Sequence, residues 1–366
     1  MDDDMSATRT FDIAIAGTGG IAGFHARAIE NLPNAQLVAV CDRDSGRVAA
    51  FAETHNAKPF TDLSRALDEV KPDVLCVTTP SGAHLEPVLA AAERGIHVIC
   101  EKPLDITPER IEQMIRACQK SNVILGAIFQ SRLSPLMGEV YQAAQEGRFG
   151  DRPTINFFVP WWRDDDYYGP DRWQGTLAMD GGGALMNQAI HGVDMVQWLA
   201  GAADDTDANP VEEVFAYTAQ NGHSSDLIEV EDTAVLNLRF RSGGLGQILA
   251  ATSMYPGSLR RLQIGGRDGM VEILEDQVLT WSFRDENEHD AFVLQQYGQA
   301  TKHGGGAADP LAMDVTNHQL NIASVLDAIE EKSPLSLTGQ EACKALEIIF
   351  AAYRSAESGN PVKLAS

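Results

Sequence analysis

The sequence predicts an α/β protein, with a doubly wound parallel sheet first and a second, strand-rich domain after it. Short apolar runs alternate with helical patterns over the first 150 residues, and a glycine-rich turn follows the first run. Beyond residue 150 the apolar runs alternate instead with turn-rich segments. The 366 residues exceed what one core usually holds, so we expect a disordered N-terminus (1–10), a nucleotide-binding domain (11–150) and a second domain (151–366).

Charge and cysteine content narrow the functional classes. The chain has 52 Asp and Glu against 28 Lys and Arg, and a net charge of −24 would repel nucleic acids and anionic membranes. No apolar stretch has the length of a membrane span, and the first residues lack the apolar core of a signal peptide, so a cytoplasmic protein is expected. The 5 cysteines show no C-x-x-C spacing, which favours buried free thiols.

A strand over Phe11–Ala16 leads into the glycine turn. Gly17 permits a tight turn, Gly19 lets the backbone approach a pyrophosphate, and Ala22 is small enough for close packing of helix on strand. This spacing is typical of dinucleotide-binding sites, although an ordinary turn between strand and helix can also show it. The candidate cofactor-binding residues of the turn are Gly17, Gly19, Gly20, Ile21 and Ala22.

Asp42 follows the next predicted strand, Gln36–Cys41, at the spacing expected for a carboxylate that binds the adenosine ribose. A carboxylate there binds the two ribose hydroxyls and repels a 2′-phosphate, so NAD is the expected cofactor. Arg43 and Arg47 leave NADP possible, but an arginine could equally stack on adenine or lie in solvent.

Two further predicted strands end in polar residues. The run 73–79 ends in Thr79 and is followed by Pro80 and His84. His84 either lines the cofactor cleft or is a structural histidine in the first turn of a helix. The run 96–100 ends at Glu101 and Lys102. Ligands of parallel sheets bind at the carboxyl ends of the strands, so Glu101 and Lys102 are site candidates; a surface ion pair is the alternative.

The remaining elements complete the predicted architecture. A composition change at Gly147–Gly150 marks the domain boundary, after helices near 109–118 and 135–146 and a strand at 123–129. Later strands are predicted at 154–159, 212–219, 233–240, 246–253, 261–265, 270–274 and 278–283. Their period-two alternation indicates a sheet with one covered face. Residues 285–309 are expected to form a polar surface loop or a lid, before amphipathic helices at 315–331 and 338–358.

The predicted helix 185–199 carries the most informative polar residues of the second domain. Asn187, His191, Asp194 and Trp198 share one helical face, opposite a face of apolar residues. A histidine flanked on its own face by an amide and a carboxylate can be oriented and tuned, which makes His191 a catalytic candidate. A packing role is expected instead for His318, on the later helix.

An aromatic and charged segment, 160–176, precedes this helix. Aromatic rings stack on the apolar faces of sugars, and arginines and carboxylates bind hydroxyl groups, so the segment suits a carbohydrate pocket. A subunit or interdomain contact is enriched in the same residue types and is the alternative. The candidates in this segment are Trp162, Arg163, Tyr168 and Trp173.

Five motifs occur in a characteristic order: the glycine turn, Thr79-Pro80 with His84, Glu101-Lys102-Pro103, Phe129-Gln130-Ser131-Arg132, and the segment Gly181–Asp194. In these motifs the chain resembles the Gfo/Idh/MocA family of oxidoreductases, from about Phe11 to the end. The resemblance implies a Rossmann domain, then a substrate-binding domain with an open, mostly antiparallel sheet through which homodimers or homotetramers form. It also implies NAD(P)-dependent oxidation or reduction of a sugar, polyol or glycoside without a metal, and often a cis peptide bond before the proline of the third motif.

The resemblance also assigns roles to residues. Lys102 would hydrogen-bond the reacting oxygen and His191 would accept the hydroxyl proton as hydride leaves, although which of the two is the base stays open. Many members have an aspartate where this chain has Asn187, which can bind a substrate hydroxyl but cannot raise the basicity of His191; Asp194 is a candidate replacement. The remaining implied residues near cofactor and substrate are Trp162, Arg163 and Gln130.

Two other functions fit the same scaffold. Tightly held NAD could oxidise a sugar transiently so that a glycosidic bond is eliminated or hydrolysed, and cofactor that stays bound through each turnover would identify this case. A catalytically silent, dinucleotide-sensing regulator is the other function, but the presence of both Lys102 and His191 argues against it. No third ligand is convincingly placed beside His191 and Asp194, so no metal site is expected.

Overall fold

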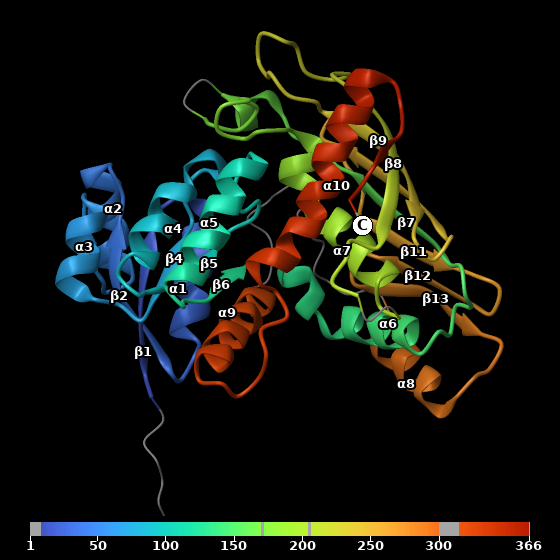
Figure 1. The fold of residues 1–366 in the computed structure, drawn as a ribbon, viewed down its shortest axis with the longest axis horizontal. Helices are drawn as coiled ribbons and strands as arrows, with labels where there is room; N and C mark the ends of the chain where they lie inside the picture. Colours follow the sequence, from blue (N-terminus) through green and yellow to red (C-terminus); the bar gives the residue numbers. More distant parts are fainter. Residues whose placement is uncertain (1–8, 170–171, 204–205, 300–314, 366) are drawn as a thin grey trace, which may run out of the picture. The chain divides into compact units, whose positions relative to one another are not determined.

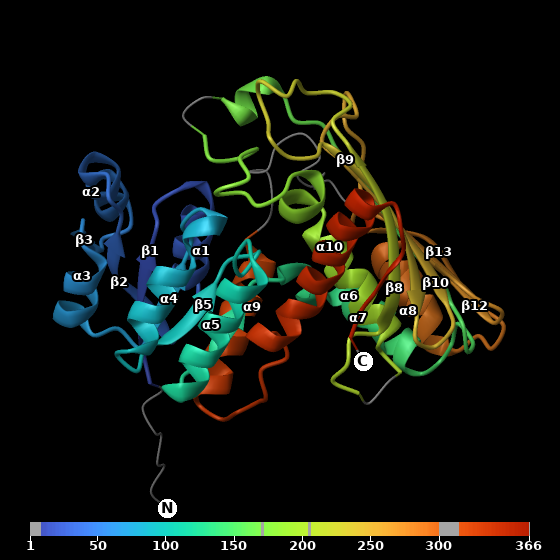
Figure 2. The same cartoon turned by 45° about the horizontal axis from the view of Figure 1, so that its top comes forward.

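The computed structural model describes residues 9–169, 172–203, 206–299 and 315–365, which belong to two compact units. The first unit consists of Met1–Gln130 and Val315–Glu341, and the second of Ser131–Asp314 and Ala342–Ser366. The expected N-terminal disorder falls largely on residues 1–8, which lie outside the described residues. The expected single boundary near Gly147–Gly150 differs from this division, because the chain returns to the first unit at residue 315. Figures 1 and 2 show the elements of both units.

The first unit contains a six-stranded parallel sheet in the order β3-β2-β1-β4-β5-β6. Its strands are β1 (Phe11–Ala16), β2 (Ala35–Cys41), β3 (Lys58–Phe60), β4 (Val74–Val77), β5 (His97–Cys100) and β6 (Leu125–Ala127). The strand order reverses between β1 and β4, and ligands of such sheets bind at the carboxyl ends of the strands beside this point. The predicted parallel sheet is confirmed, with the short edge strand β3 in addition.

Six helices of the described chain belong to the first unit: α1 (Gly20–Glu30), α2 (Ser45–Thr54), α3 (Leu63–Val70), α4 (Leu85–Ala92), α5 (Pro108–Lys120) and α9 (Thr316–Ile329). Packing explains why α9, late in the sequence, returns to this unit. Its residues Ile322, Val325 and Leu326 are fully buried in the core that also contains β1. The buried side chain of Asn321 donates to the Ala127 carbonyl at 3.2 Å and accepts from the Phe129 N–H at 3.2 Å.

The second unit contains an eight-stranded sheet in the order β13-β12-β11-β7-β10-β9-β8-β14. Its strands are β7 (Thr154–Pro160), β8 (Val211–Ala219), β9 (Thr233–Phe240), β10 (Leu245–Ala251), β11 (Arg261–Gly265), β12 (Gly269–Leu274), β13 (Gln277–Phe283) and β14 (Val362–Lys363). Only β7 and β10 pair in parallel among the pairings of the described strands, so the sheet is mostly antiparallel, as predicted. The two-residue β14 is an addition to the predicted strands.

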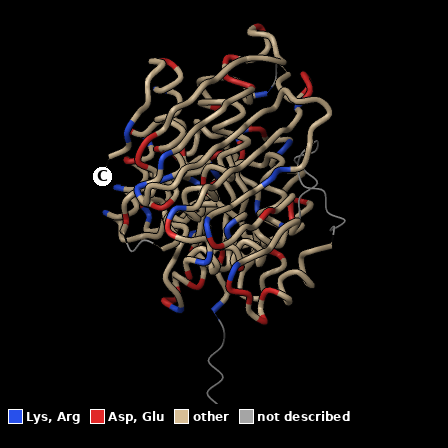
Figure 3. The backbone as a smooth tube through the Cα atoms, turned by 90° about the vertical axis from the view of Figure 1, so that its right-hand side faces the viewer, with Lys and Arg blue, Asp and Glu red and all other residues tan. Residues whose placement is uncertain are grey.

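One face of this second sheet is covered and the other is open. In β9, for example, Leu236 and Phe240 are buried while Asn237 and Arg239 are exposed. Helices α6 (Pro135–Gln145), α7 (Ile190–Ala200) and α10 (Gly339–Ser358) lie against the covered face in Figure 1. Figure 3 looks onto the opposite face, where the strands run unobstructed by the described helices and carry charges of both signs.

The predicted loop 285–309 is wrong over its first part, which contains helix α8 (Glu288–Tyr297). Asn287 and Asp290 form a capping box, in which each side chain accepts a hydrogen bond from the backbone N–H of the other. Asp290 also accepts from the indole of Trp281 at 2.6 Å and pairs with Arg148 at 2.7 Å. These long-range contacts stabilise a helix whose sequence is polar. Residues 300–309 lie outside the described residues.

Replacing Gly17 by alanine should destabilise the first unit by about 1–3 kcal/mol, because a side chain is strained at this backbone conformation. Gly17 has a φ of +96°, and an added Cβ would lie 2.7 Å from the Thr78 backbone oxygen. Gly19→Ala is the matched control, since φ there is −74° and no heavy atom lies within 4 Å of an added Cβ. Thermal unfolding followed by circular dichroism should show a lower Tm for G17A only; equal Tm values would contradict the role given to Gly17.

Candidate active site

The glycine turn of the first unit leaves the N-terminus of α1 open. The Gly17 N–H donates to the Cys41 carbonyl at 2.8 Å, and the Thr78 hydroxyl donates to the Gly17 carbonyl at 2.9 Å, which fixes the turn between β1, β2 and β4. Gly19 and Gly20 at the start of the helix are exposed, and the space in front of Gly19 is empty of protein atoms. The N-terminus of α1 is thus accessible to a pyrophosphate group, the ligand that the sequence predicts there.

Asp42, at the end of β2, is held as a carboxylate. Its Oδ2 accepts from the Thr18 N–H at 3.0 Å and the Thr18 hydroxyl at 2.8 Å, and its Oδ1 accepts from Arg47 at 2.8 Å. Burial raises the pKa of Asp42, but these hydrogen bonds and one from the Asp44 N–H outweigh burial and lower the pKa to about 2. An ionised Asp42 suits the ribose hydroxyls of NAD. Arg47 is the arginine that pairs with it, while Arg43 is exposed.

Glu101 and Lys102 lie at the carboxyl end of β5, where Lys102 is half-buried and the Lys102–Pro103 peptide bond is cis. Glu101 is only 5% exposed, which excludes the alternative of a surface ion pair. Its Oε1 lies 2.9 Å from His25 Nε2 of α1, and its Oε2 accepts from the Lys102 N–H at 3.1 Å. His318 of α9 lies farther away, with its Nε2 3.9 Å from the same Oε1.

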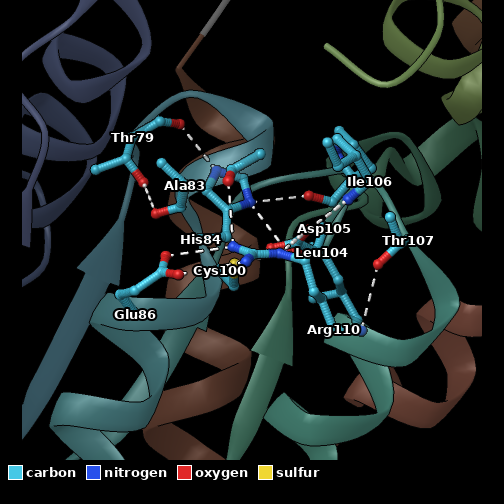
Figure 4. Close-up of polar contacts among 12 residues, drawn as sticks. Thr79, Ala83, His84, Glu86, Cys100, Leu104, Asp105, Ile106, Thr107 and Arg110 are labelled. Carbon is cyan, nitrogen blue, oxygen red and sulfur yellow. Dashed lines mark hydrogen bonds and ion pairs between the residues drawn. The ribbon is translucent and has the colours of Figure 1, made fainter. Parts of the chain in front are cut away.

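His84 joins the end of β4 to the segment after β5 (Figure 4). Its Nδ1 lies 2.9 Å from the Pro103 carbonyl oxygen and 3.1 Å from that of Leu104, and its Nε2 lies 2.9 Å from the Thr79 carbonyl oxygen. The ring is 1% exposed, and these contacts account for both nitrogens, as expected for a structural histidine. His84 lies at the N-cap of α4 and not in its first turn.

The predicted helix 185–199 is interrupted. Residues Ala184–Gln188 form a π-helical turn, and α7 begins only at Ile190, so the expected common face of Asn187 and His191 does not continue across the break. The carboxylate of the half-buried Glu231 fixes the turn by accepting from the Gly183 N–H at 2.9 Å and the Leu185 N–H at 2.8 Å. Only glycine fits at 183, because an added Cβ would lie 1.8 Å from the Glu231 backbone oxygen.

The π-helical turn contributes to a chain of hydrogen bonds in which every donor points the same way. Arg163 donates to the Gln188 oxygen at 2.9 Å, Gln188 donates to the Asn187 oxygen at 3.0 Å, and Asn187 donates to Asp180 Oδ1 at 2.6 Å. The second oxygen of Asp180 accepts from the Gly175 N–H at 2.8 Å. Two amides thus connect a guanidinium to a buried carboxylate, and aligned hydrogen bonds of this kind strengthen one another. We call Arg163, Gln188, Asn187 and Asp180 the polar chain.

Asp194, the candidate partner of His191, is bound by Arg132. The guanidinium binds both carboxylate oxygens, and the Nε of Arg132 lies 2.6 Å from Oδ2. Gln197 donates to the same carboxylate at 3.3 Å. Trp198, predicted on the same face, stacks on Tyr141 of α6 with ring centroids 4.2 Å apart. These contacts anchor α7, which carries the half-buried His191.

The aromatic segment contributes residues of two kinds. Tyr168 is 5% exposed and its hydroxyl donates to Thr252 at 3.0 Å, while Trp162 stacks on His223 with centroids 5.7 Å apart, so both pack inside the second unit. Tyr167, which the sequence analysis did not single out, accepts from Gln188 of the polar chain at 2.9 Å. Trp173 is half-buried, next to the two residues at 170–171 outside the described part.

Several residues that contact the candidate site residues show little signal in the sequence, because most of their partners are distant along the chain. They are Thr18, His25, Thr78, Tyr167, Asp180 and Gln188. The position of His25, three residues after Ala22 on the inner face of α1, is the one local signal for any of them. Gln130, which the sequence did predict, is 9% exposed, and its side-chain oxygen has no hydrogen-bond partner among the described residues.

Within the described residues, no group of three or more His, Cys, Asp or Glu side chains is arranged to hold a metal ion. In that part of the chain, no helix has the length and apolar character needed to cross a membrane. All 5 cysteines are free, and Cys41, Cys76, Cys100 and Cys118 are buried.

Comparison with known proteins gives two matching family models. One, described as an oxidoreductase family with an NAD-binding Rossmann fold, matches residues 11–129, and the other, its C-terminal α/β domain, matches residues 145–364. The WlbA dehydrogenase from Bordetella pertussis, solved with NADH and UDP-GlcNAcA, is 31% identical with a TM-score of 0.84, over 98% of this chain and 100% of that chain. Its counterpart from Chromobacterium violaceum, with the same ligands, is 31% identical with a TM-score of 0.86, over 99% and 97%. The myo-inositol 2-dehydrogenase of Thermotoga maritima is 25% identical, over 96% of this chain and 98% of its own.

Replacing Asn187 by aspartate, the residue that the family resemblance implies at this position, should destabilise the second unit by about 1–3 kcal/mol at neutral pH. The new carboxylate would replace a donor that lies 2.6 Å from Asp180, and two adjacent carboxylates cannot both ionise easily. The pKa of this carboxylate pair in the folded state would exceed the pKa of aspartate in the unfolded chain. The folded state would then bind more protons than the unfolded state, so the loss of stability would grow as pH rises through neutrality.

Urea unfolding at acid and neutral pH measures this effect. Asn156→Asp is the control, because Asn156 donates to the side-chain amide of Gln263 at 3.2 Å. If a carboxylate replaces Asn156, the Gln263 amide can rotate and donate to it, so no pair of carboxylates forms. A stability loss that is equal at both pH values, or that is equal in the two variants, would contradict the arrangement of Asn187 and Asp180.

Proposed function

Because the chain belongs to the Gfo/Idh/MocA oxidoreductase family, we propose that Lys102 and His191 carry its hydride-transfer reaction and that its substrate is a nucleotide-linked sugar acid. The class of reaction follows from the family and its characterised members. The protein is an NAD-dependent oxidoreductase of the kind that acts on sugars and polyols. The residue roles and the kind of sugar are the parts proposed here.

Lys102 suits the role of hydrogen-bonding the reacting oxygen because its backbone is fixed in position. It lies at the carboxyl end of β5, with its own N–H bound to Glu101 and the following carbonyls of Pro103 and Leu104 bound to His84. A lysine on a segment fixed in this way can hold a substrate oxygen in one position. This position of Lys102 is the observation that carries the proposal. When bound, NAD supplies the hydride acceptor, and the open N-terminus of α1 and the carboxylate of Asp42 fit its pyrophosphate and ribose.

His191 is proposed to exchange the proton of the substrate hydroxyl. It lies in the first turn of α7, a helix anchored by the buried pair of Arg132 and Asp194. An imidazole can accept a proton near neutral pH. Lys102 belongs to the first unit and His191 to the second.

The nucleotide-linked sugar acid is favoured over a free polyol by the degree of similarity. The two structures that are 31% identical to this chain contain UDP-GlcNAcA, whereas the inositol dehydrogenase is 25% identical. The polar chain supports the same class, because Arg163 is 3% exposed and lies among aromatic rings, 5.1 Å from the ring centroid of Trp161. A guanidinium in such surroundings suits an anionic ligand. We propose that Arg163, Tyr167, Asn187 and Gln130 contribute to substrate binding.

A kinetic comparison tests the residue roles and the substrate together. With NAD⁺ and UDP-GlcNAcA, myo-inositol or free N-acetylglucosamine, nicotinamide absorbance should give the highest kcat/KM for UDP-GlcNAcA. Lys102→Ala and His191→Ala should each lower kcat by roughly 10²- to 10⁴-fold, the usual contribution of acid–base groups, with NAD affinity nearly unchanged. Lys120→Ala, which removes an exposed lysine of the same unit, is the control. Turnover like that of the wild type in both variants would refute the assignment, and equal rates on all three compounds would refute the substrate class.

We also propose that the open face of the second sheet joins copies of this chain. A row of apolar side chains crosses this face in register, from Tyr217 through Val235 and Leu249 to Phe158. A neighbouring row consists of the amides of Asn237, Gln247, Asn156 and Gln263. Tyr217 is 65% exposed, and apolar rows flanked by amides are suited to a self-complementary interface. A homodimer or homotetramer is the proposed assembly.

Leu249→Lys should convert the assembly into monomers, because it places an ammonium in the middle of the apolar row. Light scattering after size-exclusion chromatography measures the molar mass directly. Leu320→Lys is the control, since Leu320 is also partly exposed, at 42%, but lies on α9 of the first unit. A wild type that is already monomeric, or an L249K variant that keeps the mass of the assembly, would refute this interface.

A further inference from the structure

Two neighbouring acidic residues of the second unit bind different segments around the candidate site. Glu231 and Asp232 lie just before β9, and Asp232 is fully buried. The Glu231 side chain accepts hydrogen bonds from the segment that begins the π-helical turn. The Asp232 side chain instead accepts from the backbone N–H groups of residues 221–223. The pair thus connects two segments that are far apart in the sequence.

Glu231 binds three consecutive backbone N–H groups at the start of the π-helical turn. Its carboxylate accepts from Gly183 and Leu185, and its backbone carbonyl accepts from the Ala184 N–H at 2.9 Å. The hydroxyl of Tyr353, on α10, donates to the same carboxylate at 3.1 Å. The first N–H groups of a helical turn have no partner within the turn, so one distant residue supplies the partners here and determines where the turn lies.

The turn carries Gln188, which connects three of the proposed substrate-binding residues. Its side-chain oxygen accepts from Arg163 at 2.9 Å, and its side-chain nitrogen donates to the Tyr167 hydroxyl at 2.9 Å and to the Asn187 oxygen at 3.0 Å. Hydrogen bonds from N–H to oxygen span only about 2.7–3.2 Å between heavy atoms. A displacement of the turn would therefore separate these side chains from one another.

Asp232 fixes the other end of the polar chain, at the backbone of Arg163. The Arg163 N–H donates to the Thr252 carbonyl at 2.9 Å, and the Arg163 carbonyl oxygen lies 2.9 Å from His223 Nε2. Asp232 binds both of these partners. Its backbone carbonyl accepts from the Thr252 N–H at 2.8 Å, and its Oδ2 accepts from the His223 N–H at 2.9 Å and lies 3.1 Å from His223 Nδ1. The peptide groups on both sides of Arg163 are thus held by residues that Asp232 binds.

We propose that Glu231 and Asp232 are positioning residues for the substrate: together they set the spacing between the π-helical turn and the backbone of Arg163, and with it the arrangement of the substrate-binding side chains. This inference rests on the proposed binding of the substrate by Arg163, Tyr167 and Asn187. Consecutive Cα atoms are held about 3.8 Å apart by the peptide bond, so two adjacent anchor residues cannot separate. The two ends of the polar chain therefore keep one relative position, which a site with several contacts to one ligand requires.

Glu231→Gln and Asp232→Asn test the proposal, because an amide offers one acceptor oxygen where the carboxylate offers two. Each variant should weaken the binding of UDP-GlcNAcA to the NADH-loaded protein by roughly 10-fold or more, since misplaced side chains lose hydrogen bonds to the ligand. Isothermal titration calorimetry measures this Kd, and the Kd of NADH should stay unchanged. Asp290→Asn is the matched control, because it removes a buried carboxylate of the same unit that binds Arg148 and Trp281 instead. A D290N variant that weakens UDP-GlcNAcA binding as much would overturn the proposal.

A double-mutant cycle separates positioning from general stability. Gln188→Ala should itself raise the Kd of UDP-GlcNAcA, and adding E231Q to Q188A should raise this Kd little further, because Glu231 acts through Gln188. A purely structural role of Glu231 would instead make the two effects on Kd multiply. Multiplied effects in the cycle, or binding like that of the wild type by E231Q or D232N, would overturn the proposal.

Tyr353→Phe keeps the proposal testable if either variant fails to fold, because it removes one hydrogen bond to Glu231 and no charge. Its Kd for UDP-GlcNAcA should rise by roughly two- to ten-fold, and an unchanged Kd would overturn the role of Glu231. Arg163→Ala distinguishes the two levels of inference. Binding of UDP-GlcNAcA by R163A that equals binding by the wild type refutes the proposed substrate site itself. Weakened binding by R163A, combined with unchanged binding by E231Q and D232N, refutes only the positioning role.

Discussion

The arrangement at the end of β5 depends on the cost of burying the Glu101 carboxylate. A charge inside a protein is tolerated only when it is paired and hydrogen-bonded. Here the pairing partner, His25, belongs to α1, the helix that begins at the glycine turn, and a hydrogen bond comes from the backbone of Lys102. A single buried ion pair therefore links the helix that fits a pyrophosphate to the segment that carries the proposed catalytic lysine, so neither can shift without exposing a charge.

The second unit applies the same constraint to the helix that carries His191. Arg132 and Asp194 are at most 6% exposed and bind each other through two hydrogen bonds, so loss of either partner would leave a buried charge uncompensated. The Asp194 carboxylate thereby fixes α7 in place. A fixed helix can hold the half-buried imidazole of His191, the proposed proton acceptor, in one orientation.

The sequence predicted most of the fold because its signals are local. Apolar runs, turn residues and the glycine spacing identified five strands of the first sheet and seven of the second, and missed only β3 and β14, which are too short to show alternation. The site was less predictable, because its determinants are distant. The break before α7 comes from Glu231, more than 40 residues later. No local pattern distinguishes Tyr167, which accepts a hydrogen bond from the polar chain, from Tyr168, which lies in the core.

Asn187 shows how such a distant partner changes the meaning of a residue. Against the aspartate that the family resemblance implies at this position, the sequence alone indicates a lost carboxylate. The buried carboxylate of Asp180, however, lies 2.6 Å from the Asn187 amide. An amide donates at one end and accepts at the other, so it can connect Gln188 to Asp180, whereas a carboxylate only accepts. The negative charge is therefore relocated within the polar chain, where aligned donors from Arg163 onward point toward it. Asn187 and Asp180 must accordingly be considered together in any account of how this site differs from that of its relatives.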